Sequence, residues 1–385
     1  MRYYIIAGEA SGDLHGSNLI KELKKLDQPA TIRCWGGDLM QAAGGELVKH
    51  YRDLAFMGFI EVVRNLGTIL RNLRFCKEDI LAFKPDALIL IDYPGFNLRI
   101  AEWAKQQGIA VIYYISPQVW AWKENRVKKM KECIDKMLVI LPFEKDYYRD
   151  KWNWEVEYVG HPLVEVVEER QLGVGSAESG VLSPGSQTNS KQTSSGKPIV
   201  ALLPGSRKQE ILKKLPIMLE VSKEFPDLQF VVAKAPGQED SFYESLLQGY
   251  PNVSSVSGKT YTLLLQSQAA LVTSGTATLE TALFAVPEVV CYKGSNISYQ
   301  IAKRLIKVKY ISLVNLIMDK LVVKELIQDD LTPTNLKREL HELLYDPTRR
   351  EQLQKDYAAL KQLLSEGGHA SAKAAASIVQ FMKND

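Results

Sequence analysis

Short apolar runs alternate with longer helical patterns along most of the chain. The clearest run is Ala87–Ile91, which has no polar alternation and predicts a strand buried on both faces of a parallel sheet. Further strands are predicted at Met1–Ala7, Thr31–Trp35, Ile109–Ile115, Lys136–Leu141, Val156–Val159, Ile199–Leu203, Leu228–Ala233, Ala269–Thr273 and Glu288–Tyr292. Because helical stretches separate these strands, the pattern predicts an α/β protein with two doubly wound, Rossmann-like domains.

The domain boundaries follow from length and from one change in composition. A chain of 385 residues is too long for one ordinary core. The segment from Gly173 to Gly196 is rich in Ser, Gly and Thr, so we expect a linker or loop at 173–197 between domains at 1–172 and 198–345. Only helices are expected after Asp319. Those at 346–385 would pack back on the first domain or on a partner chain, which leaves a homodimer open.

A long helical pattern from Phe56 to Phe83 has an unusual composition. Three arginines, Arg64, Arg71 and Arg74, lie off its apolar face. That face is formed by Phe59, Val62, Val63, Leu66, Ile69, Leu70 and Leu73. An apolar face flanked by arginines is typical of a helix that lies in a membrane interface. The alternative is an ordinary core-facing helix with a solvated basic side.

Composition excludes several classes of protein. With 46% hydrophobic residues, 24% charged residues and a net charge of +3, neither disorder nor a nucleic-acid surface is indicated. The four cysteines are far apart, which favours reduced thiols and a cytoplasmic setting over disulfides or a zinc site. Glu9 and Asp13 interrupt the first apolar run, and no stretch is long enough for a membrane-spanning helix. We therefore expect any membrane contact to be peripheral.

Asp92 stands directly after the buried run Ala87–Ile91 and is followed by the turn-forming Pro94 and Gly95. Open α/β sheets bind ligands outside the carboxyl ends of their strands, so an acid at this place is positioned for chemistry. We interpret Asp92 as a general base. The alternative is an aspartate that only caps the loop or the following helix.

Two further stretches of the first half leave alternatives open. The basic residues Lys123, Arg126, Lys128, Lys129 and Lys131 could receive a phosphate or an anionic lipid head group, or form a solvated helix face. His161, next to Pro162, is either a base or a packing histidine near a hinge. Glycines at positions 8, 12 and 16 miss the dinucleotide-binding spacing, and they permit close approach of a backbone segment or a ligand, or serve only helix packing.

The second half has a predicted phosphate site. Gly205 and Arg207 follow a buried strand, and Ser206 with Gln209 forms the sequence pattern of a capping box. The amino end of a helix attracts anions, so this turn predicts a phosphate site, the alternative being a cap beside an exposed arginine. A second turn at Ser274, Gly275 and Thr276 repeats the pattern and would add hydroxyl donors. Glu280 lies one turn into the following helix, where its carboxylate would accept hydrogen bonds from the two hydroxyls of a ribose. The alternative is an ordinary charge on the face of that helix.

No Asp-x-Asp pair occurs in the chain, so we expect a site without a metal ion. The diphosphate charge would then be neutralised by helix ends and Arg207, with Lys303 or Arg304 contributing. The cluster Lys303, Arg304, Lys307 and Lys309 competes as a membrane-facing patch, and the sequence alone does not divide these roles.

Six motifs together resemble, in order, those of the lipid-A-disaccharide synthases. They are Gly8-Glu9-Ala10-Ser11-Gly12-Asp13, Ile91-Asp92-Tyr93-Pro94-Gly95-Phe96-Asn97, Ser116-Pro117-Gln118-Val119-Trp120-Ala121-Trp122, Leu203-Pro204-Gly205-Ser206-Arg207, Ser274-Gly275-Thr276 and Tyr310-Ile311-Ser312-Leu313-Val314-Asn315-Leu316. The resemblance spans nearly the whole chain. Only the Ser/Gly-rich stretch at 173–196 departs from the family pattern.

The resemblance implies a GT-B glycosyltransferase whose two domains face each other across a cleft that closes on its substrates. It implies an inverting reaction of UDP-2,3-diacylglucosamine with 2,3-diacylglucosamine 1-phosphate, which forms a β-1,6 bond and releases UDP. No cofactor is implied, and the location would be the inner face of the cytoplasmic membrane.

The resemblance also assigns residues to these roles. Asp92 matches the general base. Ser206, Arg207, Ser274, Gly275, Thr276, Glu280 and Asn315 match positions around UDP. Glu9 and Ser11 belong to a loop at the acceptor or donor. Phe59, Val63, Arg64, Leu66, Leu70 and Arg71 match the membrane-contacting surface.

Three rival functions stay open at this stage. A transferase acting on a lipid-linked peptidoglycan precursor and a UDP-N-acetylglucosamine 2-epimerase share the expected fold, and an epimerase would need additional acid and base residues, for which His161 is the obvious candidate. A non-catalytic, nucleotide-dependent membrane adaptor would use the same phosphate site and basic helix without any need for the Asp92 carboxylate.

Overall fold

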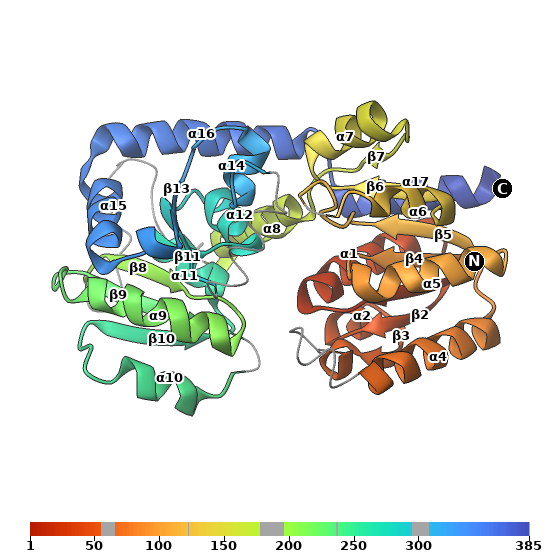
Figure 1. The fold of residues 1–385 in the computed structure, drawn as a ribbon, viewed down its shortest axis with the longest axis horizontal. Coiled ribbons are helices and arrows are strands. Elements are labelled where there is room, and N and C mark those ends of the chain that lie inside the picture. Colours follow the sequence, from red (N-terminus) through yellow and green to blue (C-terminus); the bar gives the residue numbers. More distant parts are fainter. Residues whose placement is uncertain (55–65, 122, 178–195, 236–237, 295–307, 385) are drawn as a thin grey trace. The chain divides into compact units, whose positions relative to one another are not determined.

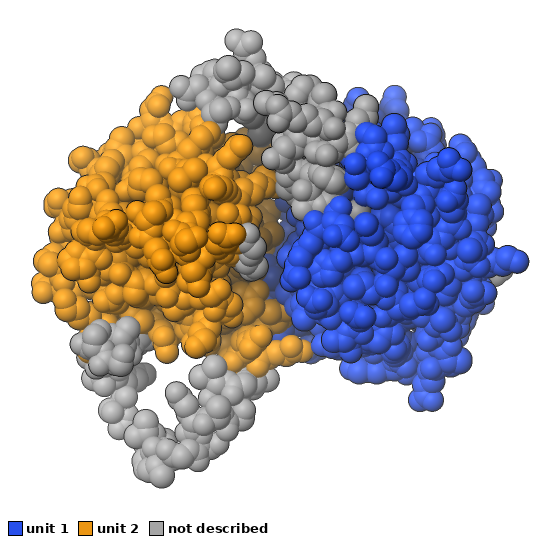
Figure 2. Space-filling model, turned by 90° about the horizontal axis from the view of Figure 1, so that it is seen from below, with its two compact units in different colours: residues 1–165, 364–385 blue, residues 166–363 orange. Residues whose placement is uncertain are grey.

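The computed structural model describes residues 1–54, 66–121, 123–177, 196–235, 238–294 and 308–384. Residues Met1–Glu165 and Leu364–Asp385 form unit 1, and Val166–Leu363 form unit 2, drawn in blue and orange in Figure 2. The first boundary therefore falls inside helix α8 (Pro162–Ala177), before the residue 172 expected from composition. Most of the expected linker, 178–195, lies outside the described residues.

Unit 1 is built on a seven-stranded parallel sheet with the order β3-β2-β1-β4-β5-β6-β7 (Figure 1). The strands are β1 (Arg2–Ala7), β2 (Thr31–Gly36), β3 (Glu46–His50), β4 (Ala87–Ile91), β5 (Ala110–Tyr114), β6 (Lys136–Val139) and β7 (Glu157–Tyr158). All five residues of β4 are buried. The unbroken apolar run therefore forms a central strand, as predicted.

The helices of unit 1 cover both faces of this sheet. They are α1 (Ala10–Leu26), α2 (Asp38–Ala42), the 3₁₀ turn η1 (Tyr51–Leu54), α4 (Leu66–Phe83), α5 (Pro94–Gln106), α6 (Arg126–Cys133), α7 (Pro142–Trp152) and α17 (Ala370–Asn384). Helices α4, α5 and α6 share one core with alternate residues of the strands. Helix α17 packs against α1. The expectation that the helices at 346–385 pack back on the first domain holds for α17 alone, because residues 346–363 belong to unit 2.

Unit 2 repeats the architecture with a six-stranded parallel sheet in the order β10-β9-β8-β11-β12-β13. The strands are β8 (Ile199–Leu203), β9 (Gln229–Lys234), β10 (Val253–Ser257), β11 (Ser267–Thr273), β12 (Glu288–Tyr292) and β13 (Lys324–Ile327). The helices are α9 (Lys208–Ser222), α10 (Asp240–Leu247), α11 (Thr260–Gln266), α12 (Thr276–Leu283), α14 (Leu313–Met318), the 3₁₀ turn η2 (Gln328–Asp330), α15 (Pro333–Tyr345) and α16 (Pro347–Ser365). The fold class is therefore confirmed as two doubly wound parallel-sheet domains.

Three strands were not predicted from the sequence, and each lies at the edge of a sheet. They are β3, β10 and β13. The expectation of helices alone after Asp319 is therefore wrong, because β13 pairs with β12. An edge strand has a neighbour on one side only and stays partly exposed, so its sequence lacks the continuous apolar run of a central strand.

Helix α4 corrects part of the prediction for residues 56–83. Ile69 and Leu73 pack into the core of unit 1, whereas the Leu70 side chain is 56% exposed. These residues therefore do not share one solvent-facing surface. Phe59, Val63 and Arg64 lie outside the described residues, as does the side chain of Leu66. Within the part of the chain that is described, no helix has the length and apolar character needed to cross a bilayer.

Candidate active site

Both units place their predicted functional residues where the strand order reverses. The order changes direction between β1 and β4 in unit 1 and between β8 and β11 in unit 2. Ala7 pairs with Ile91, so the loop after β1 lies beside Asp92. Leu203 pairs with Val272, so the turns that follow β8 and β11 are also neighbours. Doubly wound sheets bind their ligands at such reversal points.

Asp92 has a strained and firmly held backbone. Its φ is +43° and that of Tyr93 is +49°, a left-handed conformation that costs roughly 1–2 kcal/mol for a residue with a side chain. Asn97 Nδ2 and the Tyr113 hydroxyl donate hydrogen bonds to the Asp92 carbonyl oxygen at 2.8 and 2.5 Å. These two bonds fix the direction in which the Asp92 side chain leaves the backbone.

The Asp92 carboxyl group has an altered acidity. Burial raises its pKa to about 7, the negative charge of Glu9 adds to this effect, and the backbone N–H of Tyr93 opposes it. A general base works best when its pKa lies near the working pH. Asp92 is largely, but not completely, buried. Its place after β4 and its raised pKa are two properties that a general base requires.

The loop between β1 and α1 lies against Asp92 because Gly8 has no side chain. A Cβ atom at Gly8 would lie 2.3 Å from Cγ of Tyr93, so the tyrosine ring occupies that space. Glu9 precedes α1 as its N-cap residue, and Ser11 is exposed in the first turn. The approach at Gly8 was expected from a backbone segment or a ligand, and the group found there is a side chain of the same unit.

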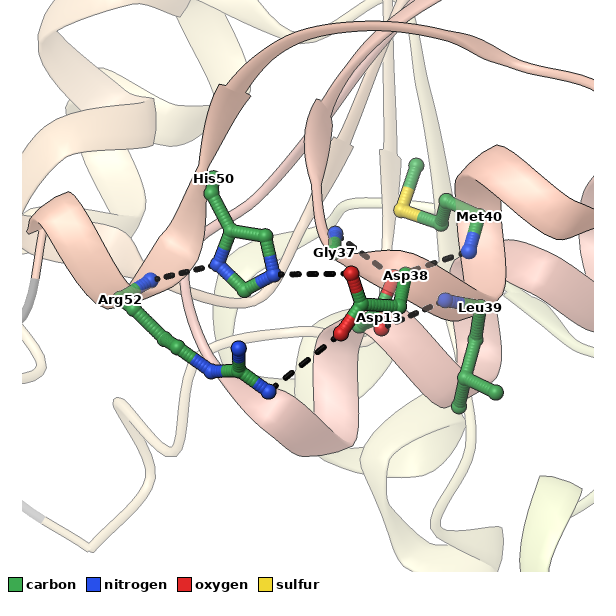
Figure 3. Close-up of polar contacts among 7 residues, drawn as sticks. All are labelled: Asp13, Gly37, Asp38, Leu39, Met40, His50 and Arg52. Carbon is green, nitrogen blue, oxygen red and sulfur yellow. Dashed lines mark hydrogen bonds and ion pairs between the residues drawn. The ribbon is translucent and has the colours of Figure 1, made fainter. Parts of the chain in front are cut away.

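Asp13 lies in the first turn of α1 and binds the segment that joins β2 to α2. It was not assigned a role from the sequence. The backbone N–H groups of Gly37, Leu39 and Met40 donate to its carboxylate at 2.7, 3.2 and 3.0 Å (Figure 3). Asp13 is 3% exposed. It therefore ties the start of α1 to the start of α2.

Glu144 anchors the segment at 116–122 and was also missed. Trp120 Nε1 donates to Glu144 Oε1 at 3.1 Å, and the backbone N–H of Leu141 donates to Oε2 at 3.0 Å. Burial raises the pKa of Glu144 to about 7, and the charge of Asp92 contributes. The sequence signal was Glu144 in the first turn of a helix that begins with a proline.

His161 is a packing residue. It is 4% exposed, and its Nδ1 accepts a hydrogen bond from the backbone N–H of Leu163 at 3.2 Å. Burial, and then the nearby His15, lower its pKa to about 3. A histidine that stays neutral and enclosed does not supply the additional acid or base that an epimerase would need.

In unit 2, the turn after β8 differs from the predicted capping box. Helix α9 begins at Lys208, its N-cap residue is Arg207, and within the described chain no side chain caps it. Gly205 has φ +114°, and a Cβ atom there would lie 2.7 Å from the Glu210 carboxylate. This left-handed turn moves the helix start past Ser206, so the box pattern does not form. Ser206 and Arg207 are exposed at the helix start.

The turn after β11 presents a second helix start. Gly275, with φ +150°, is the N-cap residue of α12, and Thr276 is exposed. The Ser274 hydroxyl donates to the carbonyl oxygen of Ile311 at 3.1 Å, so it is not the donor to a ligand that we expected. Glu280 accepts from the Tyr261 hydroxyl at 3.0 Å, and burial raises the pKa of this glutamate.

Asn315 is enclosed within unit 2. Its Nδ2 donates to the Val323 carbonyl and to Glu325 Oε1 at 2.8 and 2.9 Å, and its Oδ1 accepts from the N–H groups of Val322 and Val323. The side chain is 0% exposed. All its hydrogen-bonding capacity is used inside the protein, so Asn315 positions the backbone around it.

Glu325 is the missed partner of this network. It also accepts from the backbone N–H groups of Ile311 and Ser312 at 3.1 and 2.9 Å. The charged residue lies in the edge strand β13, which is why sequence patterning gave it no weight. Lys303, Arg304 and Lys307 lie outside the described residues. Among those that are described, no three His, Cys, Asp or Glu side chains gather into a potential metal site.

Comparison with known sequences agrees with this arrangement of motifs. The family model described as "Lipid-A-disaccharide synthetase" matches residues 3–379. The lipid-A-disaccharide synthase of Geobacter sulfurreducens is 38% identical over 372 residues, which cover 95% of this chain and 94% of that protein. Lipid-A-disaccharide synthase 1 of Legionella pneumophila (strain Philadelphia 1) is also 38% identical, over 94% and 93% of the two chains.

Solved structures share the fold at low sequence identity. The UDP-GlcNAc 2-epimerase of Neisseria meningitidis bound to UDP-GlcNAc has a TM-score of 0.66 and 13% identity, with all of both chains covered. The calicheamicin glycosyltransferase CalG4 has a TM-score of 0.58 and 15% identity, over 100% of this chain and 98% of that one. Such likeness supports the GT-B fold alone, whereas the sequence relatives extend to function. The chain therefore belongs to the lipid-A-disaccharide synthase family, the glycosyltransferases that make the lipid A disaccharide.

Proposed function

We propose that this protein joins UDP-2,3-diacylglucosamine to 2,3-diacylglucosamine 1-phosphate in a single inverting displacement. The acceptor 6-hydroxyl attacks the anomeric carbon of the donor, a β-1,6 bond forms, and the bond from that carbon to UDP breaks. Asp92 takes the hydroxyl proton, and the electron pair of the broken bond leaves with UDP. One carboxylate is sufficient, because no covalent intermediate forms.

The observation that carries this proposal is the acidity and placement of Asp92. A sugar hydroxyl is a weak nucleophile at neutral pH, so a base must accept its proton during attack. The Asp92 carboxyl group lies at the strand-order reversal of unit 1, and its pKa is raised to about 7. Glu9 and Ser11 lie at the start of the neighbouring helix α1, where we assign them to substrate binding.

Unit 2 would hold the UDP. The starts of α9 and α12 carry positive partial charge, and Arg207 adds a full one. We assign Ser206, Gly275 and Thr276 to the diphosphate, and Glu280 to the ribose hydroxyls. Asn315 and Ser274 would act indirectly, by holding the segment that contains Ile311 and Ser312.

Membrane contact is a further part of the proposal. The described part of α4 leaves Leu70 and Phe75 about half exposed, at 56% and 43%, and Arg71 is also exposed. Apolar side chains beside a cation suit the surface of an anionic membrane. The acyl chains of both substrates would reach the protein from such a surface.

Mass analysis of the products tests the reaction directly. Incubation with the two acylated glucosamines is expected to give one disaccharide 1-phosphate per UDP released, and EDTA is expected to leave the rate unchanged because helix ends and Arg207 supply the positive charge. UDP-N-acetylglucosamine without acyl chains is the control donor. UDP release without disaccharide, or a donor epimerised at carbon 2, would contradict the proposal, and a requirement for magnesium would contradict its metal-free form.

The pH dependence tests the role of Glu9. In the parent protein, kcat/KM is expected to fall as pH drops through about 7, because kcat/KM reports the free enzyme and protonated Asp92 no longer accepts a proton. Glu9→Gln removes the negative charge that helps to raise this pKa, so the acid limb should move to lower pH. The shift should be smaller than the one caused by burial, which is the larger effect.

Glu155→Gln is the matched control, because Glu155 is an exposed carboxylate of the same unit. It should leave the midpoint in place. An unchanged midpoint in Glu9→Gln would show that another group controls the acid limb.

A further inference from the structure

A pocket of about 350 Å³ lies between α5 and α6 in unit 1. Helix α5 contributes Arg99 and Glu102 to its lining, and α6 contributes Arg126 and Lys129. Met130 and Cys133, both buried in the core, also line it. This α5–α6 pocket is large enough for a small polar ligand. It also gathers part of the basic stretch whose role the sequence left open.

The charges of the α5–α6 pocket are unequal. Lys129 Nζ lies 2.6 Å from Glu102 Oε2, so these two charges compensate each other. Among the described residues, no hydrogen bond or ion pair joins the side chains of Arg99 or Arg126 to a partner. Two arginine charges therefore remain in excess. The positive charge of Arg126 also acts on Lys123. The pKa of Lys123 is lowered mainly by burial and secondly by this charge.

A phosphate monoester would balance the two positive charges of Arg99 and Arg126. It carries a charge of about −1.5 to −2 at neutral pH and three acceptor oxygens. Arginine binds phosphate through two parallel N–H groups and stays charged at all working pH values. Pro94 and Asn125 also line the pocket. They lie at the starts of α5 and α6, so the positive ends of both helix dipoles border the pocket.

The α5–α6 pocket adjoins the proposed base along the chain. Pro94, which lines it, comes two residues after Asp92. We propose that the pocket binds the phosphate of the acceptor sugar; this rests on the proposed function, in which the acceptor is a sugar 1-phosphate. In a glucosamine ring, C1, which carries the phosphate, and C5, which carries the C6 hydroxymethyl group, are both bonded to the ring oxygen, so the rigid ring keeps the phosphate at a short and nearly fixed distance from the 6-hydroxyl. A phosphate held between α5 and α6 would therefore orient the hydroxyl toward Asp92.

The same contact would let the enzyme tell its two substrates apart. Donor and acceptor both contain a diacylglucosamine, and they differ in carrying UDP or a single phosphate. A pocket that satisfies a dianionic monoester favours the acceptor, and binding of an uncharged sugar would leave the arginines without a partner. Specificity for the acceptor would then depend on Arg99 and Arg126.

The double variant Arg99→Ala/Arg126→Ala tests the assignment. The KM for the acceptor 1-phosphate is expected to rise about 10- to 100-fold, because two charge-assisted contacts are lost. The donor KM should change less than twofold. The preference for the phosphorylated acceptor over the same sugar without phosphate should fall by a similar factor. A merely structural role would affect both acceptors and the donor alike.

Lys21→Ala/Lys145→Ala is the matched control. It also removes two positive charges from unit 1, from exposed residues that do not line the α5–α6 pocket. Its acceptor KM should stay within twofold of the parent value. An equal rise of KM in both double variants would indicate a general charge effect and overturn the assignment.

Two further measurements separate this inference from the proposed function. Glucosamine 1-phosphate, titrated while the arginine side-chain NMR signals are followed, should bind the parent and not the double variant. This result would support the pocket even if the parent forms no disaccharide, and its absence would overturn the pocket even if the reaction is confirmed. Binding to phosphatidylglycerol vesicles should be equal in both proteins. Loss of vesicle binding with an unchanged acceptor KM would assign the arginines to membrane lipid instead.

Discussion

Asp92→Asn is expected to lower kcat by about 10²- to 10⁴-fold while UDP binding stays unchanged. The amide has nearly the shape of the carboxylate, but it cannot accept the proton of the attacking hydroxyl. The backbone contacts from Asn97 and Tyr113 reach the Asp92 carbonyl oxygen, so they do not depend on the side chain. Steady-state kinetics with the acylated pair and calorimetric titration with UDP measure the two effects separately.

A matched carboxylate-to-amide change at Asp227, an exposed residue of unit 2, should leave kcat within twofold. The variant at Asp92 should also lose the acid limb of the pH profile, because the group that titrates near pH 7 is gone. Full activity in Asp92→Asn would support the non-catalytic adaptor instead. Loss of UDP binding together with activity would mean that Asp92 maintains the structure.

Arg207→Ala is expected to lower kcat by about 10²- to 10³-fold and to weaken donor binding. Negative charge grows on the diphosphate as the anomeric bond breaks, and a fixed cation at a helix start stabilises that charge most in the transition state. The guanidinium is 58% exposed and lies 3.6 Å from Glu210, so it can turn toward a ligand at little cost in packing. Kinetics at varied donor concentration, together with UDP titration, measure both effects.

Lys213→Ala serves as the control for Arg207, since Lys213 is an exposed cation on the same helix. It should have almost no effect. Arg207→Lys should recover part of the rate, because the charge returns without the two-pronged geometry of arginine. If Arg207→Ala reacts at the parent rate, Arg207 does not contact the diphosphate.

The two largest effects are thus expected at the two reversal points of strand order. Asp92 follows β4 and Arg207 follows β8, and each of these strands lies beside the point where its sheet changes direction. Unit 1 has a carboxyl group with a raised pKa there, and unit 2 has a cationic helix start. The two side chains lie on opposite sides of their reversal points, because β4 is the fourth strand of its sheet in chain order and β8 is the first of its own.

Pattern alone determined the central elements of this protein. Continuous apolar runs marked β1, β4, β8 and β11, because a strand that is buried on both faces needs an apolar side chain at nearly every position. The turns after these strands contain the glycines and polar residues of the motifs, so Asp92 and Arg207 could be identified by local order. The same motifs were sufficient to suggest the family.

Tertiary structure decided which segments form edge strands, which residues contact α4 and Asn315, and how acidic Asp92 is. The edge strands β3, β10 and β13 form because a neighbouring strand pairs with them, and their sequences show no pattern that would reveal it. The division of α4 between core and solvent depends on what packs against it. Asn315 is enclosed because Val323 and Glu325 fold back onto it. The raised pKa of Asp92 comes from burial and from Glu9, which is 83 residues earlier in the sequence. Such properties depend on which distant residues meet, and only the folded chain brings them together.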